Sequence, residues 1–165
     1  MGEYQRLEHG FAPEYQMNSK ILILGSFPSV KSRELSFYYG HPQNRFWKVI
    51  AKVVQDEIPQ TIDDKKLLLK NHHIALWDVI QSCDIIGSSD SSIKNVEVTN
   101  LSIIMDACNI KQIFVNGKTA EKLYHRYSEQ ITKQKAISLP STSPANAAYS
   151  LERLVKDWEV IREYL

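Results

Sequence analysis

Four short apolar runs, separated by sequence with helical periodicity, constrain the fold of this chain more than any other feature. They are residues 21–24, 74–80, 112–116 and 136–139. A continuous apolar run of this length is typical of a strand that is buried on both faces, as in a parallel sheet. Strands that alternate with helices indicate helices on both faces of the sheet. We therefore expect an α/β fold with three layers, α/β/α, and a central, mostly parallel four-stranded sheet.

The segments between these runs predict the rest of the organisation. Helical periodicity indicates helices over residues 45–54, 62–69, 101–107, 118–127 and 145–164. Ser143 is a candidate cap for the last helix, with Pro144 in its first turn. Residues 83–98, which include GSSDSS, predict a surface loop. A chain of 165 residues has room for one core, so we expect a single domain over residues 1–165.

Composition excludes several classes of protein. Cys83 and Cys108 are far apart and the five histidines show no metal-ligand spacing, so we expect neither a metal nor another cofactor. No signal peptide or membrane span is apparent, which predicts the cytoplasm, near the nucleoid, in a prokaryote and the nucleus in a eukaryote. The net charge is +1, but residues 31–52 carry five basic residues and one acidic residue. This imbalance indicates a basic surface or a solvated helix flank.

Three loops of small residues follow predicted strands. They are GSFPS at residues 25–29, Asn116-Gly117, and LPSTSPAN at residues 139–146. Ligands of open α/β sheets bind at the carboxyl ends of the strands, where backbone N–H groups point outward. We therefore expect the three loops to line one crevice.

The first of these loops, GSFPS, matches no common catalytic loop. It lacks the downstream Gly-Lys-Ser/Thr of a phosphate-binding loop, and its serine is not flanked by glycines as a nucleophile elbow requires. Without these features the loop is either a ligand-binding wall or simply a strand-to-helix turn.

Asn44 is a second candidate, because it precedes a predicted helix within an aromatic segment. An amide can hold a water or the edge of a base, and an aromatic ring can stack on a base. The alternative is that Asn44 binds first-turn amides while the aromatic rings fill the core. The role of LPSTSPAN has two similar alternatives. It is either only the start of a helix, or a helix start whose free N–H groups bind a DNA phosphate.

Five segments carry a resemblance to a known family. They are HGFAPEY (9–15), ILILGSFPSVKS (21–32), FYYGHPQNRFW (37–47), FVNGKTA (114–120) and LPSTSPANA (139–147). With them the sequence resembles the uracil-DNA glycosylase superfamily, and most closely its hypoxanthine-DNA glycosylase branch. HPQNRFWKVI is also similar to the mismatch-specific uracil and thymine glycosylases. The resemblance implies a short parallel sheet between helices, in agreement with the pattern above.

The resemblance also implies roles for residues. The first motif of the superfamily lines the base pocket, and the last contacts the DNA backbone. Many relatives carry Asp, Glu or Asn at the third position of the first motif, where this chain has Phe27, which cannot activate water. The catalytic amide of the hypoxanthine branch corresponds to Asn44. Leu139 stands where several relatives carry His or Asn, and the chain lacks the four cysteines of relatives with an iron–sulfur cluster.

These inferences together give a candidate site. For the base pocket we expect Gly25, Ser26, Phe27, Pro28, Tyr38, Tyr39, Phe46, Trp77 and Asp78. For DNA binding we expect Ser29, Arg45, Lys118, Ser141, Thr142, Ser143 and Asn146. A core tryptophan and a helix-capping aspartate are the alternatives for residues 77 and 78.

The function predicted from this site is that of a monofunctional DNA glycosylase. It would flip a deaminated base, hypoxanthine first and uracil second, out of DNA and cleave its glycosidic bond with water, leaving an abasic site. Its partner would be DNA that contains such a base, and we expect no membrane association and a monomer. The alternative is a non-catalytic, flavodoxin-like module that binds a nucleotide or a protein in the same crevice.

Overall fold

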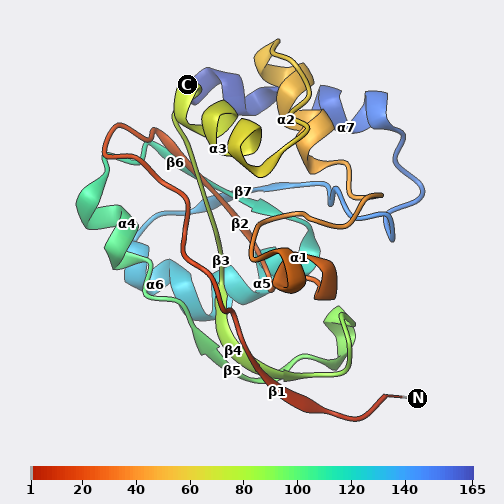
Figure 1. The fold of residues 1–165 in the computed structure, drawn as a ribbon. Coiled ribbons are helices and arrows are strands. Elements are labelled where there is room, and N and C mark those ends of the chain that lie inside the picture. The colour runs from red at the N-terminus through yellow and green to blue at the C-terminus, as the bar shows by residue number, and fades with distance from the viewer. Residues whose placement is uncertain (1) are drawn as a thin grey trace.

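The computed structural model describes residues 2–165 and contains a central four-stranded sheet (Figure 1). Its strands are β2 (Ile21–Gly25), β3 (Ile74–Asp78), β6 (Gln112–Asn116) and β7 (Ala136–Leu139). They are ordered β3-β2-β6-β7, and every neighbouring pair is parallel. The predicted four-stranded sheet is confirmed, and it is parallel throughout.

Helices cover both faces of this sheet, as Figure 1 shows. On one side lie α2 (Phe46–Val54), α3 (Ile62–Asn71) and α7 (Leu151–Trp158), the last followed by a 3-10 turn over Glu159–Tyr164. On the other side lie α4 (Ser102–Ala107), α5 (Lys118–Leu123) and α6 (Glu129–Thr132), with a π-helical turn over Tyr124–Ser128 between the last two. The predicted three-layer α/β/α fold is therefore confirmed. Among residues 2–165, no helix has both the length and the apolar character that crossing a membrane requires.

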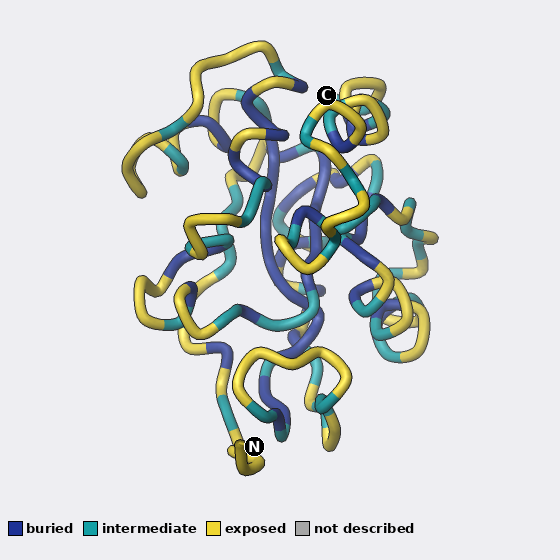
Figure 2. The backbone as a smooth tube through the Cα atoms, turned by 90° about the vertical axis from the view of Figure 1, so that its right-hand side faces the viewer, coloured by how far each residue is buried: buried dark blue, intermediate teal, exposed yellow. Residues whose placement is uncertain are grey.

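The core follows from the sequence pattern. All five residues of β2 and all five of β3 are buried, which explains their continuous apolar runs. Helix α2 buries Phe46, Val49, Ile50 and Val53, which lie on one helical face. Burying each such side chain contributes about 1.5–3 kcal/mol. Figure 2 shows buried backbone through the middle of the molecule and exposed segments around it.

A second sheet corrects the prediction of a loop over residues 83–98. Strands β1 (Gln5–Glu8), β4 (Ile80–Ile85) and β5 (Lys94–Val98) form an antiparallel sheet in the order β1-β4-β5. The register of β4 with β5 is irregular and β5 is largely exposed, so neither strand has a clear alternating pattern. Only the tip of this hairpin, which includes a 3-10 turn over Asp90–Ser92, is the expected loop. The first strand and helix α1 (Val30–Leu35) were not expected.

The last helix begins later than predicted. Ser150, and not Ser143, caps α7 by accepting a hydrogen bond from the Arg153 amide at 3.1 Å. The guanidinium of Arg45 donates hydrogen bonds to the carbonyls of Ser143, Asn146 and Tyr149. Residues 143–149 therefore wrap around this cation instead of continuing as a helix.

Candidate active site

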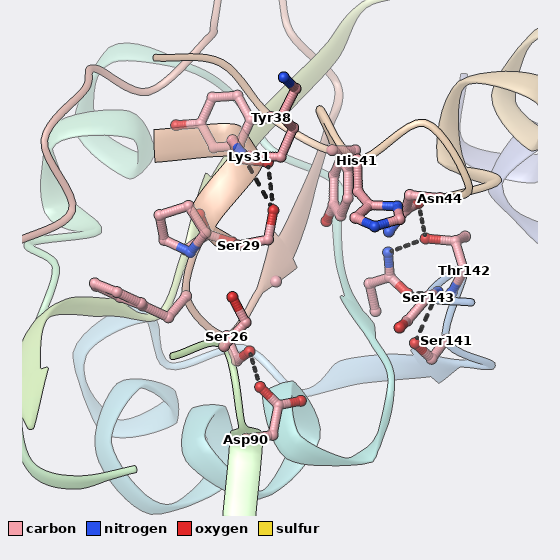
Figure 3. A pocket seen from close by; sticks show the side chains of 18 of the residues that line it. Ser26, Ser29, Lys31, Tyr38, His41, Asn44, Asp90, Ser141, Thr142 and Ser143 are labelled. Atoms are coloured by element: carbon pink, nitrogen blue, oxygen red, sulfur yellow. Dashed lines mark hydrogen bonds between the residues drawn. The ribbon is translucent and has the colours of Figure 1, made fainter. Parts of the chain in front are cut away.

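A cavity of about 320 Å³ opens at the carboxyl ends of the parallel strands (Figure 3). Its walls come from residues 25–29 after β2, Asn116 at the end of β6, and residues 141–144 after β7. The three loops therefore line one crevice, as expected. The volume lies at the lower end of the range of about 300–1,000 Å³ that is typical of small-molecule sites.

Gly25 allows the first loop to approach the end of β3 closely. A Cβ atom at this position would lie 2.5 Å from Oδ1 of Asp78 and 3.2 Å from the hydroxyl of Tyr39. Real Cβ atoms do not approach an oxygen to 2.5 Å, so a larger residue would displace the aspartate. The glycine therefore keeps the carboxylate at the cavity wall, which Asp78 lines.

Asp78 forms a buried pair with His9. Nε2 of the imidazole lies 2.7 Å from Oδ2 of the carboxylate, and the two side chains are 1% and 6% exposed. Nδ1 of His9 lies 3.0 Å from the Phe11 carbonyl, so both ring nitrogens have partners. The ring is packed among aromatic residues, with the Tyr38 ring centroid at 5.9 Å. These contacts fix the carboxylate rigidly.

Two tyrosines line the cavity between the first loop and α2. The hydroxyl of Tyr38 donates to the Ala12 carbonyl at 2.9 Å. Tyr39 has a positive φ of 53° and stacks on Phe46 with ring centroids 4.0 Å apart. Burial, and then the negative charge of Asp78, raise the pKa of Tyr39 far above its usual value, although Asn116 opposes part of this rise. The hydroxyl thus stays protonated, and it is buried without a hydrogen-bond partner of normal geometry.

The amide of Asn44 is held by two donors. Its Oδ1 accepts a hydrogen bond from the Phe46 backbone amide at 2.9 Å and another from the hydroxyl of Thr142 at 2.9 Å. Asn44 therefore binds a first-turn amide of α2, as one alternative expected, and it also lines the cavity. Figure 3 shows Asn44 and Thr142 side by side on the wall opposite the Ser26 loop.

The predicted DNA-binding residues lie in different environments around the cavity. Thr142 is fully buried, so its hydroxyl cannot contact a phosphate. The guanidinium of Arg45 is committed to backbone carbonyls. Lys118 is exposed at the start of α5, and neither it nor Asn146 lines the cavity. Ser29, Ser141, Thr142 and Ser143 do line it.

Two predicted base-pocket residues belong to the hydrophobic core. Phe46 is fully buried and Trp77 is 5% exposed, and neither lines the cavity. Both are large rings that pack inside the molecule, which is the alternative given above for the tryptophan. The other predicted residues of the base pocket, namely Gly25, Ser26, Phe27, Pro28, Tyr38, Tyr39 and Asp78, all line the cavity.

The structure also adds residues that the sequence did not suggest. His41 lines the cavity beside Asn44, with its Nδ1 accepting from the Gln43 amide at 3.1 Å. Asp90 reaches the cavity from the β4–β5 hairpin and accepts from the Ser26 hydroxyl at 3.5 Å. Burial raises the pKa of its carboxyl, although the hydroxyls of Thr119 and Ser26 oppose this rise. His41 could have been predicted as a site residue, because it lies three positions before Asn44 in the segment GHPQN. No motif or spacing indicated Asp90.

Metal ligation is not supported by any cluster in the described part of the chain. Within residues 2–165, no three His, Cys, Asp or Glu side chains gather closely enough to hold an ion. The titratable side chains at the cavity belong to Lys31, Tyr38, Tyr39, His41, Asp78 and Asp90. The cavity therefore offers hydrogen bonds, aromatic faces and two carboxylates to a ligand.

Comparison with known proteins identifies the family. The family model of the uracil DNA glycosylase superfamily matches residues 12–163. A protein of Methanosarcina acetivorans named hypoxanthine DNA glycosylase is 32% identical over 157 residues, which cover 94% of this chain and 98% of the relative. A protein of Methanosarcina barkeri with the same name is 39% identical over 114 residues, which cover 67% of this chain and 72% of the relative.

A solved structure agrees with these matches. The solution NMR structure of a Methanosarcina acetivorans protein, described provisionally as a uracil DNA glycosylase, superimposes with a TM-score of 0.81. The two sequences are 31% identical, and the match covers 95% of this chain and 96% of the chain in the NMR structure. These matches support the enzyme and not the non-catalytic module. The chain therefore belongs to the uracil DNA glycosylase superfamily and is a DNA N-glycosylase.

Proposed function

We propose that this enzyme is a monofunctional glycosylase that removes deaminated bases from DNA, hypoxanthine first and uracil second, and leaves an abasic site. We also propose that residues 1–165 act as one domain and as a monomer. The observation that carries the substrate proposal is the cavity itself, which presents the Asp78 carboxylate and the Asn44 amide together. The names of the two Methanosarcina relatives support hypoxanthine as the first substrate.

The target base must leave the duplex to enter this cavity. Its glycosidic bond is inaccessible inside stacked DNA, and a mispaired or deaminated base costs less to extrude than a paired one. Phe27 and the two tyrosines give the flipped base aromatic faces on which to stack. Ser29, Ser141 and Ser143 are the hydroxyl groups that we assign to nearby phosphates.

Asp78 would select the deaminated base. Hypoxanthine and uracil carry a ring N–H donor where their parent bases, adenine and cytosine, carry an acceptor nitrogen. Oδ2 of the aspartate is held by His9, and Oδ1 lies close to Gly25 at the cavity wall. A fixed carboxylate oxygen accepts from the N–H of a deaminated base and repels the lone pair of its parent.

Asn44 would act on the water. Cleavage breaks the bond between C1′ and the base nitrogen, the electron pair leaves with the base, and the oxygen of water forms the new bond to C1′. An amide is a poor general base, so its contribution is to hold the water below C1′. The water then loses one proton to solvent and the departing base gains one. Hypoxanthine and uracil accept the negative charge better than their parent bases, adenine and cytosine, do.

The absence of a strand-cleaving step is the last part of this proposal. That step requires a lysine that attacks C1′ and forms a Schiff base. Lys31 is the lysine that lines the cavity, and its ammonium lies 3.8 Å from the Glu34 carboxylate at the exposed surface. We therefore assign it to phosphate binding and not to attack on the sugar.

A gel assay tests the proposed function. Labelled duplexes that contain one deoxyinosine or one deoxyuridine are incubated with excess enzyme, and half of each sample is treated with alkali. We expect the enzyme to create abasic sites in the deoxyinosine strand and, to a lesser extent, in the deoxyuridine strand. Strand breaks should appear only in the samples treated with alkali. Intact strands in every lane would overturn the proposal, and tight binding of a free mononucleotide would then favour a non-catalytic module. Breaks without alkali would overturn the monofunctional assignment.

A further inference from the structure

Three side chains from distant parts of the sequence, one at a strand end and two in loops, form a continuous hydrogen-bonded chain beside the cavity. Asn116 is the last residue of β6, Thr142 follows β7, and Asn44 precedes α2. Nδ2 of Asn116 lies 3.1 Å from Oγ1 of Thr142, which lies 2.9 Å from Oδ1 of Asn44. The threonine is fully buried, so water does not compete for its hydroxyl. Figure 3 shows two members of this chain, Thr142 and Asn44, on one wall of the cavity.

Backbone groups fix the direction of every hydrogen bond in this chain. The backbone N–H of Thr142 can only donate, and it meets Oδ1 of Asn116 at 3.1 Å. The other end of the Asn116 amide is therefore its NH2, which donates to the Thr142 hydroxyl. That hydroxyl must then point its own proton at Asn44 Oδ1.

The same reasoning orients the Asn44 amide. Its Oδ1 receives the Thr142 proton and also the backbone N–H of Phe46, so both lone pairs of the oxygen are occupied. Its Nδ2 forms no hydrogen bond with the described residues. Since Asn44 lines the cavity, the amide meets a ligand through its NH2 group.

We propose that Thr142 and Asn116 are positioning residues that lock the Asn44 amide with its NH2 toward the attacking water. This inference rests on the proposed function, because it assigns a polarity to Asn44 in that reaction. An N–H donor holds a water through one oxygen lone pair and leaves the second lone pair free to attack C1′. Asn44 thus places the nucleophile and takes no proton from it.

Single-turnover kinetics on the deoxyinosine duplex test the positioning role. Thr142→Val removes the hydroxyl at nearly constant volume, and Thr142→Ser keeps it. We expect the valine variant to excise on the order of tenfold more slowly at unchanged DNA affinity, and the serine variant to stay within about twofold of wild type. Wild-type rates for Thr142→Val would overturn the proposal.

A double-mutant cycle separates positioning from general support of the fold. If Thr142 acts only through Asn44, then Thr142→Val should not slow an enzyme that already carries Asn44→Ala. An equal further slowing in that background would contradict the proposal. Asn116→Asp is a second variant, in case the buried valine prevents folding. Its carboxylate cannot donate, so the Thr142 hydroxyl turns toward it and releases Asn44, and we expect a similar loss of rate.

Asn44→Asp tests the polarity directly. The carboxylate keeps one oxygen for Phe46 and Thr142 but replaces the NH2 with a second acceptor. We expect at least a tenfold loss of excision with the fold retained, whereas wild-type or faster excision would show that an acceptor serves the water. Failure of the proposed function would appear differently, because the wild-type enzyme itself would then release no base.

Discussion

Nε2 of His9 lies 2.7 Å from Oδ2 of Asp78, and both side chains are buried, with the aspartate at the cavity wall. The imidazole occupies one carboxylate oxygen, while the other lies within reach of the cavity wall beside Gly25. A histidine near the N-terminus and an aspartate at the end of β3 thereby form one rigid unit. This unit is the basis of the selectivity that we assign to the site.

Asp78→Asn tests that selectivity. The variant keeps the size of the side chain but gives up the negative charge, and its amide can be turned to present a donor to the base. We expect excision of hypoxanthine to fall about 10- to 100-fold, since a hydrogen bond to a charged group contributes about 1.5–3 kcal/mol. Single-turnover rates on deoxyinosine duplexes measure the effect, and circular dichroism checks the fold. Unchanged rates would remove Asp78 from base recognition.

Gly25→Ala should disturb the same carboxylate from the opposite side. The new methyl group would lie 2.5 Å from Asp78 Oδ1, and the aspartate cannot retreat without losing its contact with His9. We expect a loss of activity and a free energy of unfolding lowered by about 1–3 kcal/mol. Denaturant unfolding and the excision assay measure both. Gly87→Ala is the matched control, because a Cβ there meets no atom within 4 Å, although its φ of 59° also adds some strain.

Asp90 should make DNA binding dependent on pH. Burial raises the pKa of its carboxyl, so the group loses its proton at a higher pH than an exposed aspartate does. Below that pKa the side chain is neutral, and above it the negative charge repels DNA phosphates at the cavity. We expect wild-type affinity for DNA to fall as pH rises through this pKa.

Asp90→Asn should bind DNA about fivefold more tightly near pH 8, with the advantage vanishing at acidic pH. Fluorescence anisotropy with a non-cleavable duplex, from pH 8 down to the ordinary pKa range of an exposed aspartate, measures this difference. The stability of the folded protein should change with the same sign. It should fall as pH rises from the ordinary pKa of an exposed aspartate to the raised pKa of Asp90, because only the folded state keeps the proton in that interval. Identical pH profiles for the two proteins would contradict this account of Asp90.

Arg45→Met should release the loop over residues 143–149. The guanidinium lies 3.2 Å from the Ser143 carbonyl and 3.0 Å from the Asn146 carbonyl, and it also binds the Tyr149 carbonyl. We expect weaker DNA binding and a free energy of unfolding lowered by about 2–4 kcal/mol. Arg45→Lys should not restore either property, because one ammonium group cannot donate in the same geometry as the several N–H groups of the planar guanidinium.

Lys48→Met is the matched control for that prediction. Lys48 is exposed on the same helix, α2, and its loss removes the same charge without touching the loop. Thermal unfolding and DNA affinity should distinguish the two methionine variants. Equal effects would mean that Arg45 contributes only its charge.

The parallel sheet was predictable because its strands are buried on both faces. Their apolar runs need no partner sequence to be recognised, and Ile21–Gly25 is buried at every position. The antiparallel sheet was not predictable, since β4 and β5 combine an irregular register with exposed positions. The start of α7 was missed because Ser143-Pro144 is a sound local helix signal that Arg45 overrides through long-range hydrogen bonds.

The candidate site also combines residues that could be predicted from the sequence with residues that could not. Motif residues such as Gly25 and Asn44 could be identified from their neighbours in the sequence. The full burial of Thr142 could not be predicted, because it depends on how distant segments pack around it. Asp90 reaches the cavity from a hairpin whose polar sequence resembles any surface turn. Side chains that act through tertiary contacts leave no spacing pattern in a single sequence.

Analysis of the products tests the central proposal most directly. A deoxyinosine duplex is treated with excess enzyme in water enriched in ¹⁸O, and the released base and the abasic sugar are examined by mass spectrometry. We expect free hypoxanthine in an amount equal to the abasic sites, with ¹⁸O bonded to C1′ and the phosphate backbone intact. Failure to release hypoxanthine, or a sugar trapped covalently on the protein by borohydride, would contradict the proposal.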